Sequence, residues 1–224
     1  MVEVLFFLLL SIMETDKFYH IYNRTNNKEL LFKEDINYFY FLNQFKKYIS
    51  PISDVYAYCL IPNHFHFVLK IKESSHLERF FEAKLEKAKT KSQDLQGFEN
   101  LGGLKLISQQ FSNLFNSYTK SINKKYNRNG SLFAQNFKKK EINTEKYLQQ
   151  VILYVHLNPF FHAVSDDFES YLHSSYNSII SLKTTELKRK EVIDLFGDKQ
   201  NFIFMHQKRK LDEEMLSSIM EEDE

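Results

Sequence analysis

The chain has 224 residues, of which 43% are hydrophobic, so it can bury one sizeable core with additions. Five glycines and three prolines argue against long low-complexity linkers, and the single cysteine, Cys59, excludes an internal disulfide and fits a reducing cytosol. The net charge of only +1 conceals an uneven distribution of charge along the chain.

Charged side chains are concentrated in two stretches. No acidic residue occurs from Asn100 to Lys140, which contains eight basic residues, whereas Asp212–Glu224 contains seven acidic residues and no Lys or Arg. The basic middle of the chain favours a polyanionic partner. The acidic end favours a tail that is solvated or autoinhibitory. Charge runs are also typical of ordinary solvated faces, so this pattern supports a function without establishing it.

The N-terminal part predicts an extension followed by the first core elements. Residues 1–13 are expected to be an extension, because the apolar run Leu5–Leu10 is too short to span a bilayer and Glu3 stands where a secretory signal carries a basic residue. A signal peptide is the alternative, and no membrane partner is expected. Three elements follow with alternating or helical spacing: a strand (Phe18–Arg24), a helix (Asp35–Tyr48) and a strand (Asp54–Leu60).

A histidine-bearing strand comes next, after the turn residues Pro62-Asn63. Side chains alternate in a strand, so His64, His66 and Val68 share one face and the Phe and Leu side chains between them share the other. The Cα atoms of the two histidines are expected roughly 6–7 Å apart, so both imidazoles can converge on one metal ion. A plain polar strand face is the alternative, and a metal site needs a further ligand from elsewhere.

The remaining elements complete the order of the core. A charged helix is expected over Ser75–Lys91, in an insertion at 72–104. A helix, a basic strand and a last core helix follow, at Ile107–Tyr126, Ser131–Ile142 and Glu145–Asn158. Thr144 is expected to cap the last helix, and Pro159 disfavours helical conformation at the residue before it, so Asn158 is expected at the helix end.

This order predicts an α+β fold with a ferredoxin-like βαββαβ antiparallel sheet. Helices cover one face of such a sheet, and the last core helix can cross the open face and approach the histidines. The expected domains are the extension, a catalytic domain at 14–165 and a helical C-terminal extension with an acidic tail at 166–224. Helical segments within that extension are expected at Tyr171–Tyr176 and Glu186–Phe196.

The last core helix supplies the expected partner of the histidines. Tyr154 and Asn158 are four residues apart and therefore lie on one helix face. A metal held by His64, His66 and Asn158 would place the Tyr154 hydroxyl beside it. The amide oxygen suits a hard cation and no cysteine is near, which favours Mg²⁺ or Mn²⁺ over structural zinc. Tyr147, nearly two turns earlier, is a rival tyrosine on the same face, and packing of either tyrosine on the sheet is the alternative.

Four motifs together resemble the REP-associated tyrosine transposases, within the HUH superfamily of single-stranded DNA transposases. They occur in family order over roughly residues 17–165, at Tyr19–Arg24, Pro62–His66, Arg128–Phe133 and Tyr154–Pro159. The resemblance implies the HUH endonuclease fold, with Tyr154 as the nucleophile and His64, His66 and Asn158 as the metal ligands and catalytic partners of that tyrosine. It also implies a hairpin-bearing single-stranded DNA substrate and a bacterial, cytoplasmic, nucleoid-associated protein. The sequence leaves open whether the protein is a monomer or a homodimer. It also leaves open whether the tyrosine-bearing helix acts on its own sheet or on a partner's.

Nucleic acid is expected to contact the basic segment and the end of the first strand. The candidate DNA-binding residues are Asn23, Arg24, Lys120, Lys124, Lys125, Arg128, Lys138, Lys139 and Lys140. Of the other histidines, His20 is expected in the core or near DNA and His156 at the surface or in packing, whereas His162 and His173 are given no role.

Two functions from different classes remain. The first is a metal-dependent enzyme that nicks and rejoins single-stranded DNA through a 5′-phosphotyrosyl intermediate. It needs no ATP, which agrees with the lack of a GxxxxGK[ST] loop in the sequence. The second is a domesticated, non-cutting binder of hairpin DNA or RNA. The presence of both histidines, Tyr154 and Asn158 favours the enzyme, because a pure binder needs none of them.

Overall fold

The computed structural model describes residues 13–26, 29–89, 103–134, 137–209 and 219. The strands are β1 (Phe18–Arg24), β2 (Ser53–Ile61), β3 (His64–Ile71) and β4 (Lys138–Ile142). The helices are α2 (Asp35–Tyr48), α3 (Ser74–Lys89), α4 (Gly103–Lys125), α5 (Glu145–Phe161), α6 (Tyr176–Ile180), α7 (Arg189–Leu195) and α8 (Lys199–Gln207).

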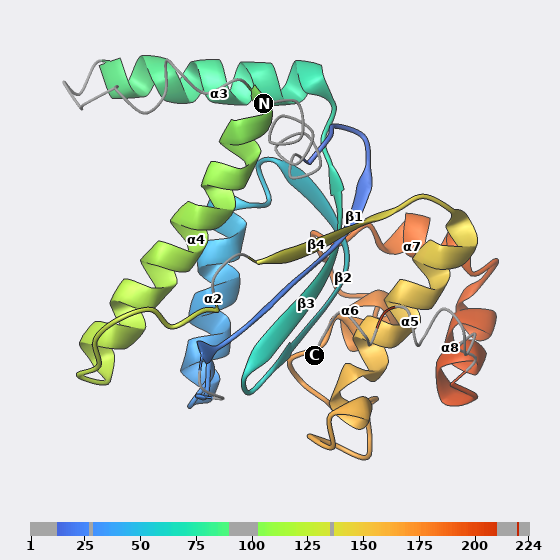
Figure 1. Ribbon diagram of the computed structural model, residues 1–224. Coiled ribbons are helices and arrows are strands. Elements are labelled where there is room, and N and C mark those ends of the chain that lie inside the picture. Colours follow the sequence, from blue (N-terminus) through green and yellow to red (C-terminus); the bar gives the residue numbers. More distant parts are fainter. Residues whose placement is uncertain (1–12, 27–28, 90–102, 135–136, 210–218, 220–224) are drawn as a thin grey trace, which may run out of the picture. The chain divides into compact units, whose positions relative to one another are not determined.

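The strands form one four-stranded sheet in the order β2-β3-β1-β4 (Figure 1). The central strand β1 pairs antiparallel with β3 and with β4. This strand order, with helices after β1 and β3, is the ferredoxin-like arrangement. The predicted α+β fold with a βαββαβ antiparallel sheet is therefore confirmed.

The described residues fall into two compact units. The first contains the described residues within 1–17, 40–53 and 71–130, and the second contains those within 18–39, 54–70 and 131–224. In the first unit, α4 packs on the second half of α2, where Phe41 meets Tyr118 edge to face and the Tyr40 hydroxyl lies 2.6 Å from Ser121 Oγ. The second unit contains most of the sheet and α5 to α8. The predicted division at residues 14, 72–104 and 166 stays a prediction.

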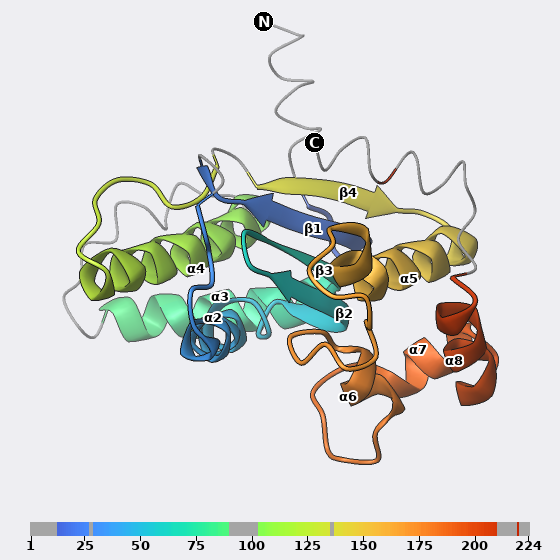
Figure 2. The same ribbon diagram turned by 90° about the horizontal axis from the view of Figure 1, so that it is seen from below.

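Helix α5 lies against the sheet within the second unit, as Figure 2 shows. Thr144 caps it, because the side-chain oxygen of Thr144 accepts a hydrogen bond from the backbone N–H of Tyr147. Every residue from Gln150 to Pro159 is buried, so the helix is surrounded by other elements and not half exposed. One core cluster joins α5 to β2, β3 and the C-terminal helices, and it includes Val68, Val151 and Phe202.

Helix α5 continues past the predicted end. Asn158 was expected to end the helix before Pro159, but the helix continues to Phe161 with Pro159 inside it. Proline removes one N–H donor, yet the following residues still wind, because the backbone N–H of His162 donates to the carbonyl of Asn158 at 3.1 Å. The correction moves the helix end three residues further along the chain.

Three further differences from the predicted elements concern their presence or extent. Helix is absent from the described segment Tyr171–Ser175, because Ser174 pairs with Cys59 of β2 in an isolated bridge. Helix α8, at 199–207, was not predicted. The predicted strand Ser131–Ile142 is regular only from Lys138.

The predicted N-terminal extension and acidic tail lie almost wholly outside the described residues. Among the helices that the structure describes, none combines the length and the apolar character needed to cross a bilayer.

Candidate metal centre and tyrosine

Each of the two histidines of β3 has a hydrogen-bond partner at its Nδ1 atom. The register of β1 with β3 places Tyr22 opposite His66 and His20 opposite Val68, so all four side chains share one face. His20 Nε2 lies 3.0 Å from His66 Nδ1, and Asn63 Oδ1 lies 2.8 Å from His64 Nδ1. The Asn63 oxygen can only accept, so His64 carries its proton on Nδ1. If His66 donates to His20 in the same way, both Nε2 atoms are left with a lone pair.

These Nε2 atoms have no hydrogen-bond partner among the residues that the structure describes, although both are buried. The same holds for the Oδ1 and Nδ2 atoms of Asn158 on α5, a residue with 0% exposure. The Asn158 side chain faces His64 and favours its protonated form, but no hydrogen bond of ordinary geometry joins the two. Buried polar groups are nearly always paired, so these orphaned groups require an explanation.

The imidazoles are neutral at pH 7. Burial, with a smaller effect of the neighbouring His162, lowers the pKa of His64 to about 3. Burial also lowers the pKa of His66 well below 6.5, and His64 beside it adds to this. Neutral imidazole is the form that binds a metal ion.

His162, which was given no role from the sequence, belongs to this cluster. The ligand atoms of His64, His66 and His162 all lie within 4.8 Å of one another, and the rings of His64 and His162 have centroids 4.4 Å apart. His162 is the exposed member, at the C-cap of α5, whereas His66 is buried. A sequence signal existed, because His162 follows Asn158 by four residues.

The donor set fits a divalent metal ion. Three imidazole nitrogens and one amide oxygen are common ligands of divalent cations, and the buried members lack other partners within the described part of the chain. Histidines that bind a metal usually form a hydrogen bond through their other ring nitrogen, which orients the ring. The contacts of His64 with Asn63 and of His66 with His20 are of this kind.

Tyr154 lies beside these groups. Its ring meets that of His66 at 90° with centroids 5.6 Å apart, meets that of His20 at 81° and 6.1 Å, and stacks on Phe161 at 5.8 Å. The predicted set of His64, His66, Tyr154 and Asn158 is therefore brought together within a single chain. The Tyr154 side chain is fully buried, with 0% exposure.

Tyr147 has different surroundings. It packs against the core cluster two turns before Tyr154, and the ammonium of Lys140 lies 5.6 Å from its ring centroid. His156 was expected at the surface or in packing, and it is wholly buried in packing. Its Nδ1 lies 2.9 Å from His206 Nε2, and its Nε2 lies 2.7 Å from Ser175 Oγ. His20 is buried next to the histidine cluster, in agreement with its expected core position.

The candidate DNA-binding residues are divided between the two units. Lys120, Lys124, Lys125 and Arg128 belong to the first unit, whereas Asn23, Arg24 and Lys138 to Lys140 belong to the second. Asn23 is buried, and its Oδ1 accepts from the backbone N–H of Arg24 at 2.9 Å, so it shapes the end of β1. Arg24 pairs in register with His64, which places it on the same face of the sheet as His64 and His66.

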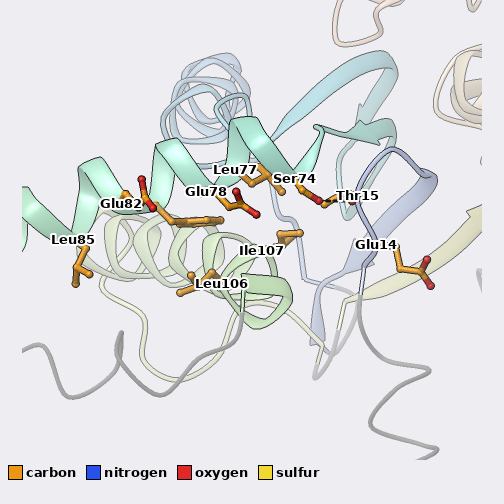
Figure 3. A pocket seen from close by; sticks show the side chains of 10 residues that line it. Glu14, Thr15, Ser74, Leu77, Glu78, Glu82, Leu85, Leu106 and Ile107 are labelled. Carbon is orange, nitrogen blue, oxygen red and sulfur yellow. Dashed lines mark hydrogen bonds between the residues drawn. The ribbon is translucent and has the colours of Figure 1, made fainter.

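A cavity of 610 Å³ lies in the first unit (Figure 3). Five apolar side chains and three carboxylates line it together with Thr15 and Ser74: Leu77, Phe81, Leu85, Leu106, Ile107, Glu14, Glu78 and Glu82. Carboxylates repel phosphate, so this cavity does not have the character of a nucleic-acid site.

No family model matches the sequence, and no curated protein matches it. Among solved structures, a REP-associated tyrosine transposase bound to a REP hairpin resembles the chain with a TM-score of 0.47 and 12% identity, over 75% of this chain and 81% of that chain. At this TM-score the likeness is distant, so the candidate site rests on its own geometry.

Proposed function

We propose that the chain is a metal-dependent endonuclease and transposase that nicks and rejoins single-stranded DNA through a 5′-phosphotyrosyl intermediate. One observation carries the proposal. The two Nε2 atoms and the Asn158 amide are buried without partners among the described residues, and Tyr154 packs directly on the ring of His66. Buried polar groups of this kind are retained where a ligand pairs them.

The chemistry follows from these side chains. A bound divalent cation would polarise the scissile phosphate and stabilise its developing charge. The Tyr154 oxygen attacks phosphorus, forming a new P–O bond while the bond from phosphorus to the 3′ oxygen breaks. The phenol gives up one proton and the leaving 3′ oxygen gains one. One phosphodiester replaces another, so the step is close to energy-neutral and the free 3′-OH can reverse it.

The substrate class comes from the motif resemblance and from charge. The resemblance implies a DNA hairpin. Arg24 and Lys138 to Lys140 place cations towards one end of the β1–β4 pairing, where Tyr22 pairs with Lys138, in the unit that contains the site. Our expectation of Mg²⁺ or Mn²⁺ as the ion belongs to the proposal. All four proposed side chains come from one chain, so no second subunit is required to assemble the site.

A non-cutting binder of hairpin DNA or RNA is the second candidate. The observation that favours it is the burial of Tyr154, because a nucleophile must reach a phosphate and this side chain has 0% exposure. Catalysis therefore requires the hydroxyl to become accessible when nucleic acid binds. The binder requires no such movement.

The deciding experiment incubates the full chain with hairpin-bearing single-stranded oligonucleotides and Mn²⁺ or Mg²⁺ and follows the covalent protein–DNA adduct on denaturing gels. The adduct is expected with the wild type and with Tyr147→Phe, the matched control on the same helix. It is expected to vanish in Tyr154→Phe, in His64→Ala and with chelator. Binding without any adduct would support the second candidate, and an adduct in Tyr154→Phe would refute the assignment of the nucleophile.

A further inference from the structure

The C-terminal half of α5 and its C-cap carry a stripe of three polar or aromatic side chains. Tyr154, Asn158 and His162 follow one another at intervals of four residues, which places them on one side of the helix. The turn is fixed at its end, because the backbone N–H of His162 donates to the carbonyl of Asn158. The continuation of α5 past Pro159 is what brings the His162 imidazole to the histidines of β3.

The distances suit a shared metal ion. The ligand atoms of the three histidines lie within 4.8 Å of one another. Nitrogens bound to one metal at about 2.0–2.1 Å in tetrahedral geometry lie about 3.4 Å apart, so the widest pair needs to close by at most about 1.4 Å. His162 is exposed at the C-cap of α5, and its side chain can make this adjustment by changing rotamer without disturbing the buried ligands.

We infer that His162 is the third imidazole ligand of this centre and that the site therefore selects a transition metal, such as Mn²⁺, Co²⁺ or Zn²⁺, over Mg²⁺. The inference rests on the metal centre of the proposed function and narrows its choice of ion. Imidazole suits transition metals, whereas Mg²⁺ requires oxygen ligands and dehydrates reluctantly. His64, His66 and His162 supply three nitrogens, against one oxygen from Asn158.

The exposure of His162 also indicates where the site opens. His66 and Asn158 are buried at 1% and 0% exposure, while His162 lies at the solvent side of the cluster. A metal ion would enter past His162, and its open coordination position would face the same side. A helix C-terminus can also use a histidine simply to complement the helix dipole, which requires no metal. The experiment below separates these two roles.

The test is calorimetric titration of the metal-free full chain with Co²⁺, Zn²⁺ and Mg²⁺, together with the visible absorption of the Co²⁺ form. The wild type is expected to bind Co²⁺ and Zn²⁺ at one site that millimolar Mg²⁺ does not compete for. His162→Gln is expected to weaken Co²⁺ binding by about tenfold or more and to change the Co²⁺ spectrum. The matched control is His76→Gln, since His76 Nε2 lies 3.0 Å from the Pro51 carbonyl in the first unit.

A second variant gives a positive readout. His162→Cys replaces nitrogen by sulfur, and the Co²⁺ form is expected to gain a thiolate-to-cobalt charge-transfer band. Unchanged Co²⁺ affinity and spectrum in His162→Gln, or effective competition by Mg²⁺, would overturn the inference.

The adduct assay keeps the two proposals apart. An adduct that forms equally with Mg²⁺ in the wild type and in His162→Gln would preserve the nicking function and refute the role of His162. Loss of Co²⁺ binding in His162→Gln, with no adduct ever formed by the wild type, would preserve the metal inference and refute the nicking function.

Discussion

Asn158 offers the sharpest test of whether the centre exists to hold a ligand. Its amide is fully buried, and neither Oδ1 nor Nδ2 finds a hydrogen-bond partner in the described part of the chain. An unpaired buried amide costs about 1–3 kcal/mol in protein mutational data. Asn158→Leu removes that cost while roughly keeping the volume of the side chain. The metal-free variant is therefore expected to be more stable than the wild type by about 1–3 kcal/mol.

The assay is urea denaturation of both proteins with chelator and then with saturating Co²⁺. Metal is expected to stabilise the wild type by about 2.7 kcal/mol at a concentration 100 times its Kd, and to stabilise Asn158→Leu much less. Asn37→Leu is the matched control. Asn37 is equally buried, but its Oδ1 accepts from the backbone N–H groups of Lys33 and Glu34 at 2.9 and 3.1 Å, so this variant should lose stability. If metal-free Asn158→Leu were destabilised as much as Asn37→Leu, the amide would serve the fold and our explanation of the orphaned groups would fail.

Three further predictions concern His206 on α8, His20 beside His66, and Lys138 on β4. Burial lowers the pKa of His206 to about 4, so the contribution of this group to stability is fully present above about pH 6.5 and falls by about 3 kcal/mol as the pH drops towards 4. Urea denaturation across this range should give a flatter pH dependence for His206→Gln, and an unchanged slope would contradict the prediction. His20→Phe removes the contact at His66 Nδ1, and calorimetry should show Co²⁺ affinity reduced about 10–100-fold; full affinity would mean that His20 does not orient the ligand. Lys138→Glu should weaken single-stranded DNA binding and reduce its salt dependence, measured by fluorescence anisotropy, and identical salt slopes would remove Lys138 from the interface.

The sheet and its histidine face could be predicted because they depend on local patterns. The alternation around His64 and His66 specifies which side chains share a face, and the predicted bounds of Phe18–Arg24 and Asp35–Tyr48 match β1 and α2. Helical spacing likewise placed Tyr154 and Asn158 on one face of α5. The order of these elements was then enough to infer the ferredoxin-like sheet.

The contacts that orient the candidate ligands depend on the pairing register of the strands, which the sequence alone did not determine. His20 reaches His66 because β1 and β3 pair with His20 opposite Val68, one step along the strand from Tyr22 and His66. A shift of this register by one residue would turn His20 to the other face of the sheet. Alternation within each strand leaves that shift undetermined, so the sequence could place His20 in the core but could not identify it as the partner of a ligand.

His162 was not identified from the sequence as a candidate ligand for a different reason. A proline usually ends a helix at the residue before it, and this rule stopped the predicted helix at Asn158. Pro159 lies near the end of α5, so the one backbone N–H that it lacks affects only the end of the helix. The backbone N–H of His162 still donates to the Asn158 carbonyl. The same spacing of four that linked Tyr154 to Asn158 then extends to His162. The proposed nucleophile and two of the proposed ligands thus lie on one periodic stripe. Our proposed choice of metal depends on the continuation of α5 past Pro159, which brings His162 to the histidines of β3.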